Sequence, residues 1–255
     1  MVTMADELVH IAVDRGVATI TLDSPHNRNA LSRQLRGELR SHLAHAVDDD
    51  NVRVILLDHT GPVFCAGMDL KEAGGAAAGD QGVNEFPEIL EQIRTSPKPV
   101  VAKLAGPARA GGVGIVAAAD IAIAASSATF AFTEVRIGVV PAVISVTVLP
   151  RLLPRAAHEL FLTGETFDAT RAASIGLINS AVPAEELDAE VKRYTDMLGL
   201  GGPVALAATK ALLRSGPGDF ATMLKLSAEF FASEEGQEGI IAFAQKRKPN
   251  WVPED

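Results

Sequence analysis

Two turns built from small residues have the composition and spacing to bind a developing negative charge. Gly111-Gly112 lies between a strand-like apolar run at 99–104 and an apolar, helix-like run. Ala66-Gly67 follows a second apolar run at 52–57 and precedes Met68. The first backbone N–H groups of a helix have no intrahelical partner, so such turns can bind an anion or an oxygen atom that is becoming one. Both turns are therefore candidates for a ligand site.

A single acid in an apolar stretch is the candidate for proton transfer. Glu134 is the only charged residue between Asp120 and Arg136. An acid in so apolar a setting tends toward a raised pKa, which suits proton transfer near neutral pH. From these residues alone a structural explanation stays open, in which the glycines only allow close packing and Glu134 caps a helix.

The composition narrows the class of protein. Apolar residues make up 47% and charged residues 22% of the 255 residues, as expected for a globular protein with a substantial core. The net charge of −9 argues against nucleic acid as the main partner, because phosphate binding needs a basic face. The only tight basic run is Lys246-Arg-Lys248, close to the end.

Further residue patterns bear on metals and location. Cys65 is the only cysteine, which excludes an internal disulfide and indicates a reducing compartment. The six histidines lack metal-ligand spacing, so we expect no metal site. No signal peptide and no run of ~20 apolar residues is evident, and we therefore expect a cytoplasmic protein without a membrane partner.

The elements around these candidates follow from periodicity. A hairpin is predicted at 8–13 and 17–22, and Ser32 is predicted to cap a helix that buries Leu35, Leu39, Leu43 and Val47. Further strands are predicted at 52–57, 99–104, 120–124 and 177–182, with a helix at about 84–95. The glycine-rich segment 73–82 is expected to be a mobile loop that can cover a site.

From Pro183 onward the chain is predicted to be helical only. Leu187, Val191, Tyr194 and Leu198 form one apolar stripe, and Gly201-Gly-Pro203 ends that helix and starts the next. Two more helices are expected at about 219–232 and 234–246. The predicted architecture is an α/β core of strand–helix units over 1–182 with an all-helical region over 183–255.

Taken together, these motifs resemble the crotonase, or enoyl-CoA hydratase/isomerase, family over about residues 8–250. The order and spacing of the motifs carry the resemblance more than any one of them does. They are Asn27-Arg-Asn-Ala-Leu31, Phe64-Cys-Ala-Gly-Met-Asp-Leu70, Lys98-Pro-Val-Val-Ala102, Ala110-Gly-Gly112 with Asp120, Glu134 with Gly138 and Pro141, Leu162-Thr-Gly164, Ala172 with Gly176-Leu177, and Lys246-Arg-Lys-Pro249.

The resemblance implies a fold, a substrate and two backbone donors. It implies a spiral of ββα units with a helical C-terminal region that forms trimers, often paired into hexamers. The substrate would be an acyl-CoA thioester, with coenzyme A as part of the substrate and no further cofactor. The thioester oxygen would lie between the backbone N–H groups of Met68 and Gly111, which stabilise the enolate.

The resemblance also implies positions along the coenzyme A path. These are Arg28, Ala30, Ala66, Asp69, Leu70 and Gly112, with Lys246 or Lys248 reaching a phosphate of coenzyme A bound either to the same chain or to a neighbouring subunit. Arg28 as a plain loop residue and the lysines as a solvated helix end are equally weighted alternatives. Phe86, Ile89, Leu90 and Phe161 are candidates for an acyl pocket, although core packing explains each of them as well.

The sequence departs from the family pattern at Gly114. Common hydratases of this family carry a first glutamate here and a second at the position of Glu134, so a mechanism in which two carboxylates share one water is not available. Hydration is the main hypothesis, either through Glu134 alone or with a carboxylate of the substrate in place of the missing acid, and Δ3,Δ2-enoyl-CoA isomerisation is the alternative. A non-catalytic acyl-CoA binder is the third possibility.

The segment 132–145 is similar to a subgroup that includes 3-methylglutaconyl-CoA and isohexenylglutaconyl-CoA hydratases. Those branched substrates carry a second carboxylate, which Arg136 or Arg109 would neutralise here.

A rival hypothesis from another enzyme class rests on Gly112-Val-Gly-Ile-Val-Ala117, which fits a dinucleotide fingerprint with Glu134 as the ribose-binding acid. Its context argues against it, since a longer loop with Pro107 separates strand from helix.

Overall fold

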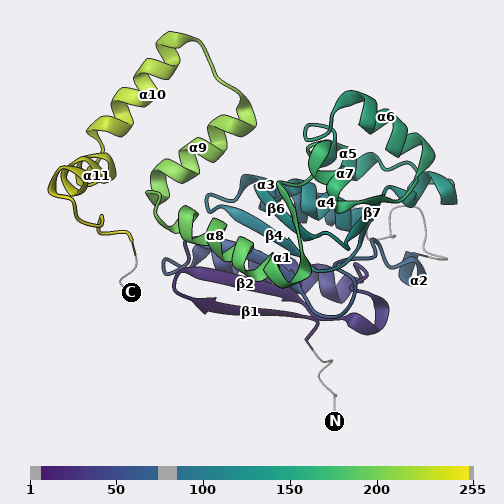
Figure 1. The fold of residues 1–255 in the computed structure, drawn as a ribbon. Coiled ribbons are helices and arrows are strands. Elements are labelled where there is room, and N and C mark those ends of the chain that lie inside the picture. The colour runs from purple at the N-terminus through teal and green to yellow at the C-terminus, as the bar shows by residue number, and fades with distance from the viewer. Residues whose placement is uncertain (1–6, 74–84, 253–255) are drawn as a thin grey trace.

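The computed structural model describes residues 7–73 and 85–252 of the chain. Figure 1 shows a mixed sheet covered by helices, with the helices nearest the C-terminus extending away from it. The strands are β1 (Val9–Asp14), β2 (Val17–Leu22), β3 (Val54–His59), β4 (Val100–Leu104), β5 (Ala108–Arg109), β6 (Ile121–Ala125), β7 (Thr129–Ala131), β8 (Phe167–Asp168) and β9 (Ser180–Val182). The helices up to the last strand are α1 (Arg33–Asp48), α2 (Leu70–Ala73), α3 (Phe86–Thr95), α4 (Gly111–Ala118), α5 (Ala142–Val148), α6 (Pro154–Thr163) and α7 (Ala169–Ser174).

The C-terminal part adds helices only. They are α8 (Leu187–Gly199), α9 (Pro203–Ser215), α10 (Phe220–Ala232) and α11 (Glu234–Gln245). Short 3-10 helices lie at η1 (Pro25–Asn27), η2 (Thr133–Ile137) and η3 (Ala184–Glu186). None of the helices within the described ranges is both long and apolar enough to cross a lipid bilayer.

The main sheet has six strands in the order β1-β2-β3-β4-β6-β9. β1 and β2 form the predicted antiparallel hairpin, and every later neighbour pair is parallel. Parallel neighbours need a crossover between them, and α1, α3 and α4 lie in those crossovers. A second sheet of three short strands, in the order β5-β7-β8, lies beyond the C-terminal end of β4.

Both faces of the parallel strands are buried, which explains their nearly continuous apolar sequences. On β4, Val100 and Ala102 join the main core, whereas Val101 joins a smaller cluster on the other face. That smaller cluster contains Leu187 and Val191 of α8, so the apolar stripe predicted from sequence is confirmed. Because α8 covers the sheet, it packs as part of the α/β core even though it follows the last strand.

Several local predictions are confirmed with small shifts in boundaries. The Ser32 side chain caps α1 by accepting from the Leu35 N–H, as expected. The strand predicted at 52–57 begins instead at Val54, because Val52 is held in a turn through a bond from its N–H to the Asp49 carbonyl. The strand predicted at 177–182 begins only at Ser180. The loop predicted at 73–82 lies outside the described residues apart from the last residue of α2.

The arm formed by α9, α10 and α11 meets the core through few buried groups. Figure 1 shows the arm leading away from the sheet. Lys210 is the buried side chain of α9, and its Nζ lies 2.7 Å from the Asp120 carboxylate. At the start of the arm, the Arg53 guanidinium donates to the carbonyls of Gly201 and Trp251. The attachment of the arm is therefore largely polar.

Candidate active site

The two turns singled out in the sequence are joined edge to edge. The Phe64 N–H donates to the Pro107 carbonyl at 3.0 Å, and the Arg109 N–H donates to the Cys65 carbonyl at 2.9 Å. A Cβ atom at Gly112 would lie 2.7 Å from the Cys65 carbonyl oxygen, a distance that real Cβ contacts do not show. Only glycine therefore allows this approach of the two turns.

This contact brings the predicted donors Met68 and Gly111 close together. Gly67 has φ +90°, a conformation that L side chains rarely adopt, and a Cβ there would lie 3.5 Å from the Gly111 nitrogen. Within the described part of the chain, the N–H groups of Met68 and Gly111 have no hydrogen-bond acceptor. Two free N–H groups on adjoining turns have the arrangement of an oxyanion hole.

Ala110 holds the second donor in place. It precedes α4 with φ 48° and ψ −116°, a conformation that costs a non-glycine residue of the order of 1–3 kcal/mol. Its N–H donates to the Ala131 carbonyl, and its own carbonyl accepts from the N–H groups of Val113 and Gly114. Because these bonds begin the helix at Gly111, the Gly111 N–H is left at the positive end of the α4 dipole.

Glu134 is carried to the same edge as these donors. β5 and β7 are parallel, so the segments that follow them, with Gly111 after β5 and Glu134 after β7, leave the small sheet at one edge. Glu134 lies in η2 and is half-buried, and its Oε2 atom is fully buried without a hydrogen-bond partner in the described structure. Burial raises the pKa of this carboxyl above 4.5, and a backbone hydrogen bond partly opposes the rise. The raised pKa expected from the sequence is confirmed.

Gly114, where the family pattern has a first glutamate, has no room for a side chain. A Cβ atom there would lie 2.6 Å from Cγ2 of Ile144 and 3.7 Å from Cδ1 of Leu90. The Thr147 hydroxyl also donates to the Gly114 carbonyl at 3.1 Å. Apolar groups of α5 and α3 therefore fill the space beside α4 that a carboxylate side chain at this position would enter.

The structure also places most of the predicted coenzyme A path in one strip. The Ala66 N–H donates to the Arg28 carbonyl at 3.1 Å, and the Leu31 N–H donates to the Gly67 carbonyl at 2.8 Å. Ala30 is buried between them, while the Arg28 side chain is exposed. Asp69 and Leu70 follow directly, at the start of α2. The segments 28–31 and 66–70 thus lie side by side.

The two arginines proposed to bind a second carboxylate differ in their surroundings. The Arg109 guanidinium donates to the carbonyls of Ala108 and Thr129 and to the Thr129 hydroxyl, so it is engaged by the β5–β7 edge. The Arg136 side chain is exposed, and its Nε donates to the Thr163 carbonyl at 3.2 Å. Within the described residues, Arg136 has no acidic partner. Arg136 is therefore the better candidate of the two.

Lys246 is not brought to the other site residues within one chain. It ends α11 with φ 54° and is exposed. Figure 1 shows α11 and α2 on opposite sides of the molecule, with the sheet between them. A role for Lys246 at the site accordingly requires a neighbouring subunit.

The sequence analysis named Phe86 as a candidate for the acyl pocket and quoted Asn29 and Leu31 within the motif at 27–31, but it did not predict the contacts that these residues make at the site. Leu31 and Phe86 wall the Gly111 turn, since a Cβ at Gly111 would lie 2.9 Å from Leu31 Cδ1 and 3.3 Å from the Phe86 ring. Asn29 ties the 24–31 loop to the 60–63 loop through bonds from its Nδ2 to the carbonyls of Thr60 and Val63. Asn29 has φ 52°, and an asparagine in a turn-rich segment was the only available signal.

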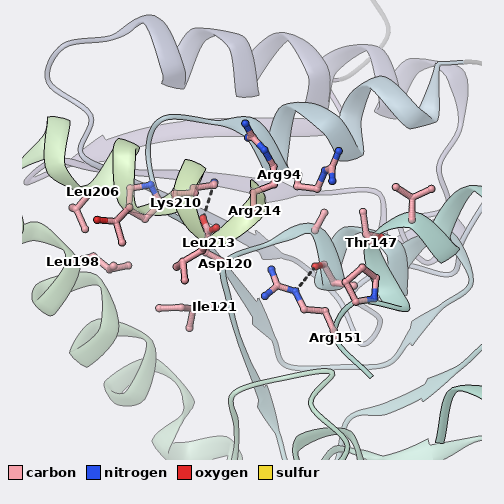
Figure 2. Close-up of a pocket in the computed structure, with 16 residues that line it drawn as sticks. Arg94, Asp120, Ile121, Thr147, Arg151, Leu198, Leu206, Lys210, Leu213 and Arg214 are labelled. Carbon is pink, nitrogen blue, oxygen red and sulfur yellow. Dashed lines mark hydrogen bonds and ion pairs between the residues drawn. The ribbon is translucent and has the colours of Figure 1, made fainter. Parts of the chain in front are cut away.

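A cavity of about 440 Å³ lies at the other end of α4, between α9 and the core. Figure 2 shows the Lys210–Asp120 ion pair in it, with Arg151 on the opposite wall. The Arg151 guanidinium donates to the carbonyls of Ala117 and Ala119. These cations are thus already paired, and the α4 helix separates the cavity from the Gly111 turn by about 12 Å.

Two other site types receive no support from the described residues. Gly112 and Gly114 lie inside α4 rather than in a tight turn between strand and helix, so the dinucleotide fingerprint lacks its required context. Among the described residues, no group of three or more His, Cys, Asp or Glu side chains is arranged to hold a metal ion.

Comparisons with known proteins show the family to which the chain is similar. A family model described as enoyl-CoA hydratase/isomerase matches residues 12–254. The rat enoyl-CoA hydratase domain-containing protein 3, mitochondrial, is 36% identical over 245 residues, which are 92% of this chain and 81% of that protein.

Solved structures show the same similarity. The human enoyl coenzyme A hydratase domain-containing protein 3 is 32% identical with a TM-score of 0.89, over 96% of this chain and 100% of the other. An enoyl-CoA hydratase from Mycobacterium avium is 42% identical with a TM-score of 0.75, over 97% and 100%. These matches confirm the crotonase-like fold.

Proposed function

The chain belongs to the enoyl-CoA hydratase/isomerase, or crotonase, family, and from that premise we propose that it adds water across the 2,3 double bond of an enoyl-CoA thioester. The observation that carries this proposal is the combination of two N–H groups, on Met68 and Gly111, with the Glu134 Oε2 atom: within the described residues neither N–H has an acceptor, and Oε2 is buried without a hydrogen-bond partner. The two N–H groups suit a developing enolate oxygen, and the Glu134 carboxyl suits proton transfer.

The two N–H groups act on the thioester carbonyl. As a nucleophile adds to C3, the electrons of the double bond move toward C2 and the carbonyl oxygen becomes an enolate oxygen. Donors already oriented toward that oxygen stabilise the transition state without reorganising, and each is worth about 3 kcal/mol. Because both are backbone groups, the Met68 side chain has no chemical role.

Glu134 supplies the proton transfers. Its carboxylate takes a proton from water while the water oxygen bonds to C3, and the enolate forms at C1 and C2. The carboxylic acid then gives that proton to C2, which collapses the enolate to the thioester. The product gains one hydroxyl at C3 and one hydrogen at C2, and the Glu134 carboxylate is regenerated.

The alternative activity is isomerisation. The packing of Ile144 against Gly114 supports it, because this packing leaves no room for a second carboxylate side chain at that position. Moving a double bond from C3–C4 to C2–C3 requires one base that takes a proton from C2 and returns it to C4. A single carboxylate is sufficient for that sequence, with the same two N–H groups stabilising the dienolate.

One experiment separates these activities. Purified protein and Glu134→Gln are assayed with straight-chain 2-enoyl-CoAs, methylglutaconyl-CoA and a 3-enoyl-CoA. Water addition that is lost in Glu134→Gln supports the hydratase proposal. Double-bond migration without hydration supports the isomerase. Tight binding of CoA esters without turnover of any of them overturns both and supports an acyl-CoA binder.

For the substrate we propose a branched enoyl-CoA that carries a second carboxylate. The support is Arg136, which follows Glu134 by two residues and has no acidic partner within the described ranges. Arg136→Ala is expected to lower kcat/KM for methylglutaconyl-CoA about tenfold relative to crotonyl-CoA. Arg155→Ala, on the exposed side of α6, is the matched control. An unchanged ratio in Arg136→Ala would contradict this specificity.

The remaining parts of the proposal concern coenzyme A and assembly. Coenzyme A runs along Arg28, Ala30, Ala66, Asp69 and Leu70, past Gly112, and it belongs to the substrate, so no further cofactor is needed. Lys246 reaches a CoA phosphate from a neighbouring subunit of a homotrimer or a dimer of trimers. We place the protein in the cytoplasm.

A further inference from the structure

Arg36 is a buried cation that the proposed mechanism does not use. Its side chain is 3% exposed, although it lies on α1 among residues that otherwise bury only apolar groups. Its Nε has no hydrogen-bond acceptor in the described structure. Burying a guanidinium is costly when its donors are incompletely paired, so the position calls for a reason beyond packing.

The first contact of Arg36 leads to both oxyanion donors. Its Nη1 donates to the Leu31 carbonyl at 2.5 Å. The Leu31 N–H donates to the Gly67 carbonyl, and Leu31 forms a β-bridge with Met68. The Leu31 side chain also packs against the Gly111 turn. Leu31 therefore touches the segments that carry each donor, and Arg36 fixes its carbonyl.

The second contact of Arg36 leads to the Gly111 turn from the other side. Its Nη2 lies 3.7 Å from the Glu85 carboxylate, which is half-exposed. Glu85 directly precedes Phe86, whose ring faces the Gly111 position. The planar guanidinium, with donors at fixed angles, thus joins the two residues that wall Gly111.

We propose that Arg36 is a positioning residue for the oxyanion hole: by bridging the Leu31 carbonyl and Glu85, it sets the spacing of the Met68 and Gly111 N–H groups. The inference rests on the proposed function. A displacement of these donors by a fraction of an ångström weakens their bonds to the enolate oxygen, because hydrogen bonds depend steeply on distance and angle. The affinity for the coenzyme A portion does not depend on this spacing.

The test compares Arg36→Met with Arg40→Met. Arg40 lies one turn later on α1 and also reaches α3, through its ion pair with Glu88 at 2.8 Å, yet it has no bond to Leu31. The readouts are kcat, KM, binding of coenzyme A, melting temperature, and the absorbance shift of a chromophoric enoyl-CoA, which reports polarisation of the bound carbonyl. The wild-type protein must first show turnover and an absorbance shift, because their absence would contradict the proposed function itself.

We expect Arg36→Met to lower kcat about 10- to 100-fold and to reduce the absorbance shift by at least half, with coenzyme A binding changed less than threefold. Arg40→Met should leave kcat and the shift unchanged. Full kcat and shift in folded Arg36→Met, or equal losses in Arg40→Met, would overturn the inference.

Arg36→Lys covers the case in which Arg36→Met does not fold. It keeps the charge but cannot bridge both partners with a planar fork, so a smaller loss of kcat and shift is expected at a near-native melting temperature. If Arg36→Lys folds with the full shift and full kcat, the role of Arg36 is structural only.

Discussion

At the scale of single residues, the burial of Glu134 has consequences for both activity and stability. Burial raises the pKa of this carboxyl above 4.5, so the ionised base is lost at a higher pH than for an exposed glutamate. We expect kcat/KM to fall on the acidic side with a midpoint above 4.5. Glu134→Gln should lower kcat about 10²- to 10⁴-fold and abolish this limb of the pH profile.

The stability of the same variant should change in the opposite direction. Because the folded pKa is raised, folding favours the protonated form, and stability decreases as the pH rises above 4.5. At pH 7 Glu134→Gln removes a buried charge and should raise the free energy of unfolding, measured in urea. Glu165→Gln, an exposed acid nearby, is the control. If kcat/KM of the wild-type protein stays constant down to pH 4.5, the assignment of Glu134 as the catalytic base is contradicted.

The buried ring of His59 is hydrogen-bonded through both of its nitrogen atoms. Its Nε2 accepts from the Ala105 N–H at 3.0 Å, and its Nδ1 faces the Thr60 carbonyl at 3.2 Å, as suits a neutral ring protonated on Nδ1. Burial lowers the pKa of His59 below 6.5, with the Thr60 hydrogen bond opposing. Protonation of Nε2 would replace the Ala105 bond by a clash of two donors.

This tautomer predicts an acid-sensitive fold. The contribution of His59 to stability is complete above the unfolded pKa of 6.5 and is lost as the pH falls below it, by up to about 1.4 kcal/mol per pH unit. Urea unfolding of wild type and His59→Gln between pH 7.5 and 5 measures the difference in slope. His158→Gln, which changes an exposed side chain of α6, is the control, and equal slopes in wild type and His59→Gln would exclude the effect.

At the scale of elements, the contact between α4 and α5 decides which side chains can stand beside the site. A Cβ at Gly114 would lie 2.6 Å from Ile144 Cγ2, so Gly114→Ala should cost about 1–3 kcal/mol by overpacking. Ile144→Ala should cost about 2–5 kcal/mol by leaving a cavity. The double variant should be more stable than the sum predicts, by about 1 kcal/mol or more, because each change relieves the other.

The measurement is the free energy of unfolding of all four proteins in urea at one pH. Strict additivity would mean that Ile144 can move aside without cost and that the space beside Gly114 is not fixed. Coupling of the expected sign would support the view that the chain has committed this space to apolar packing rather than to a second carboxylate.

The elements themselves could largely be predicted from sequence, because their signals are local. The hairpin, the Ser32 cap and the α8 stripe each depend on residues within one or two turns, and the structure confirms them. The two small-residue turns and the apolar setting of Glu134 were predictable for the same reason. Their meeting at one edge was an expectation that rested on family resemblance.

The contacts that were missed join segments far apart in the chain. Ile144 fills the space beside Gly114 across 30 residues, and Arg36 reaches Glu85 across a longer separation. Neither follows from hydrophobic periodicity, since a buried arginine on α1 looks in sequence like an exposed one. The separation of Lys246 from the site depends on how the arm is placed, which local patterns do not encode.

At the scale of the whole molecule, the arm leaves apolar side chains exposed along its length. α10 buries no side chain, and Phe220 is 96% and Phe243 of α11 88% exposed. Exposed aromatic side chains on adjoining helices are typical of a surface that packs against another chain. The polar attachment of the arm through Lys210 and Arg53 holds its direction while leaving these faces free.

These faces support the proposed trimer, and the last prediction tests it. We expect a mass in solution of about three or six times the 26.7 kDa of one chain, measured by sedimentation equilibrium at micromolar concentration. Phe220→Asp with Phe231→Asp should shift the mass toward the single chain, because charges then replace apolar contacts; Lys225→Gln on the same helix should not. If a neighbouring subunit supplies Lys246, the dissociated variant should also show a raised KM for CoA esters. That KM should depend less on ionic strength than the KM of the wild-type protein does. A wild-type mass of one chain, with the same KM in both variants, would remove the support for a shared site.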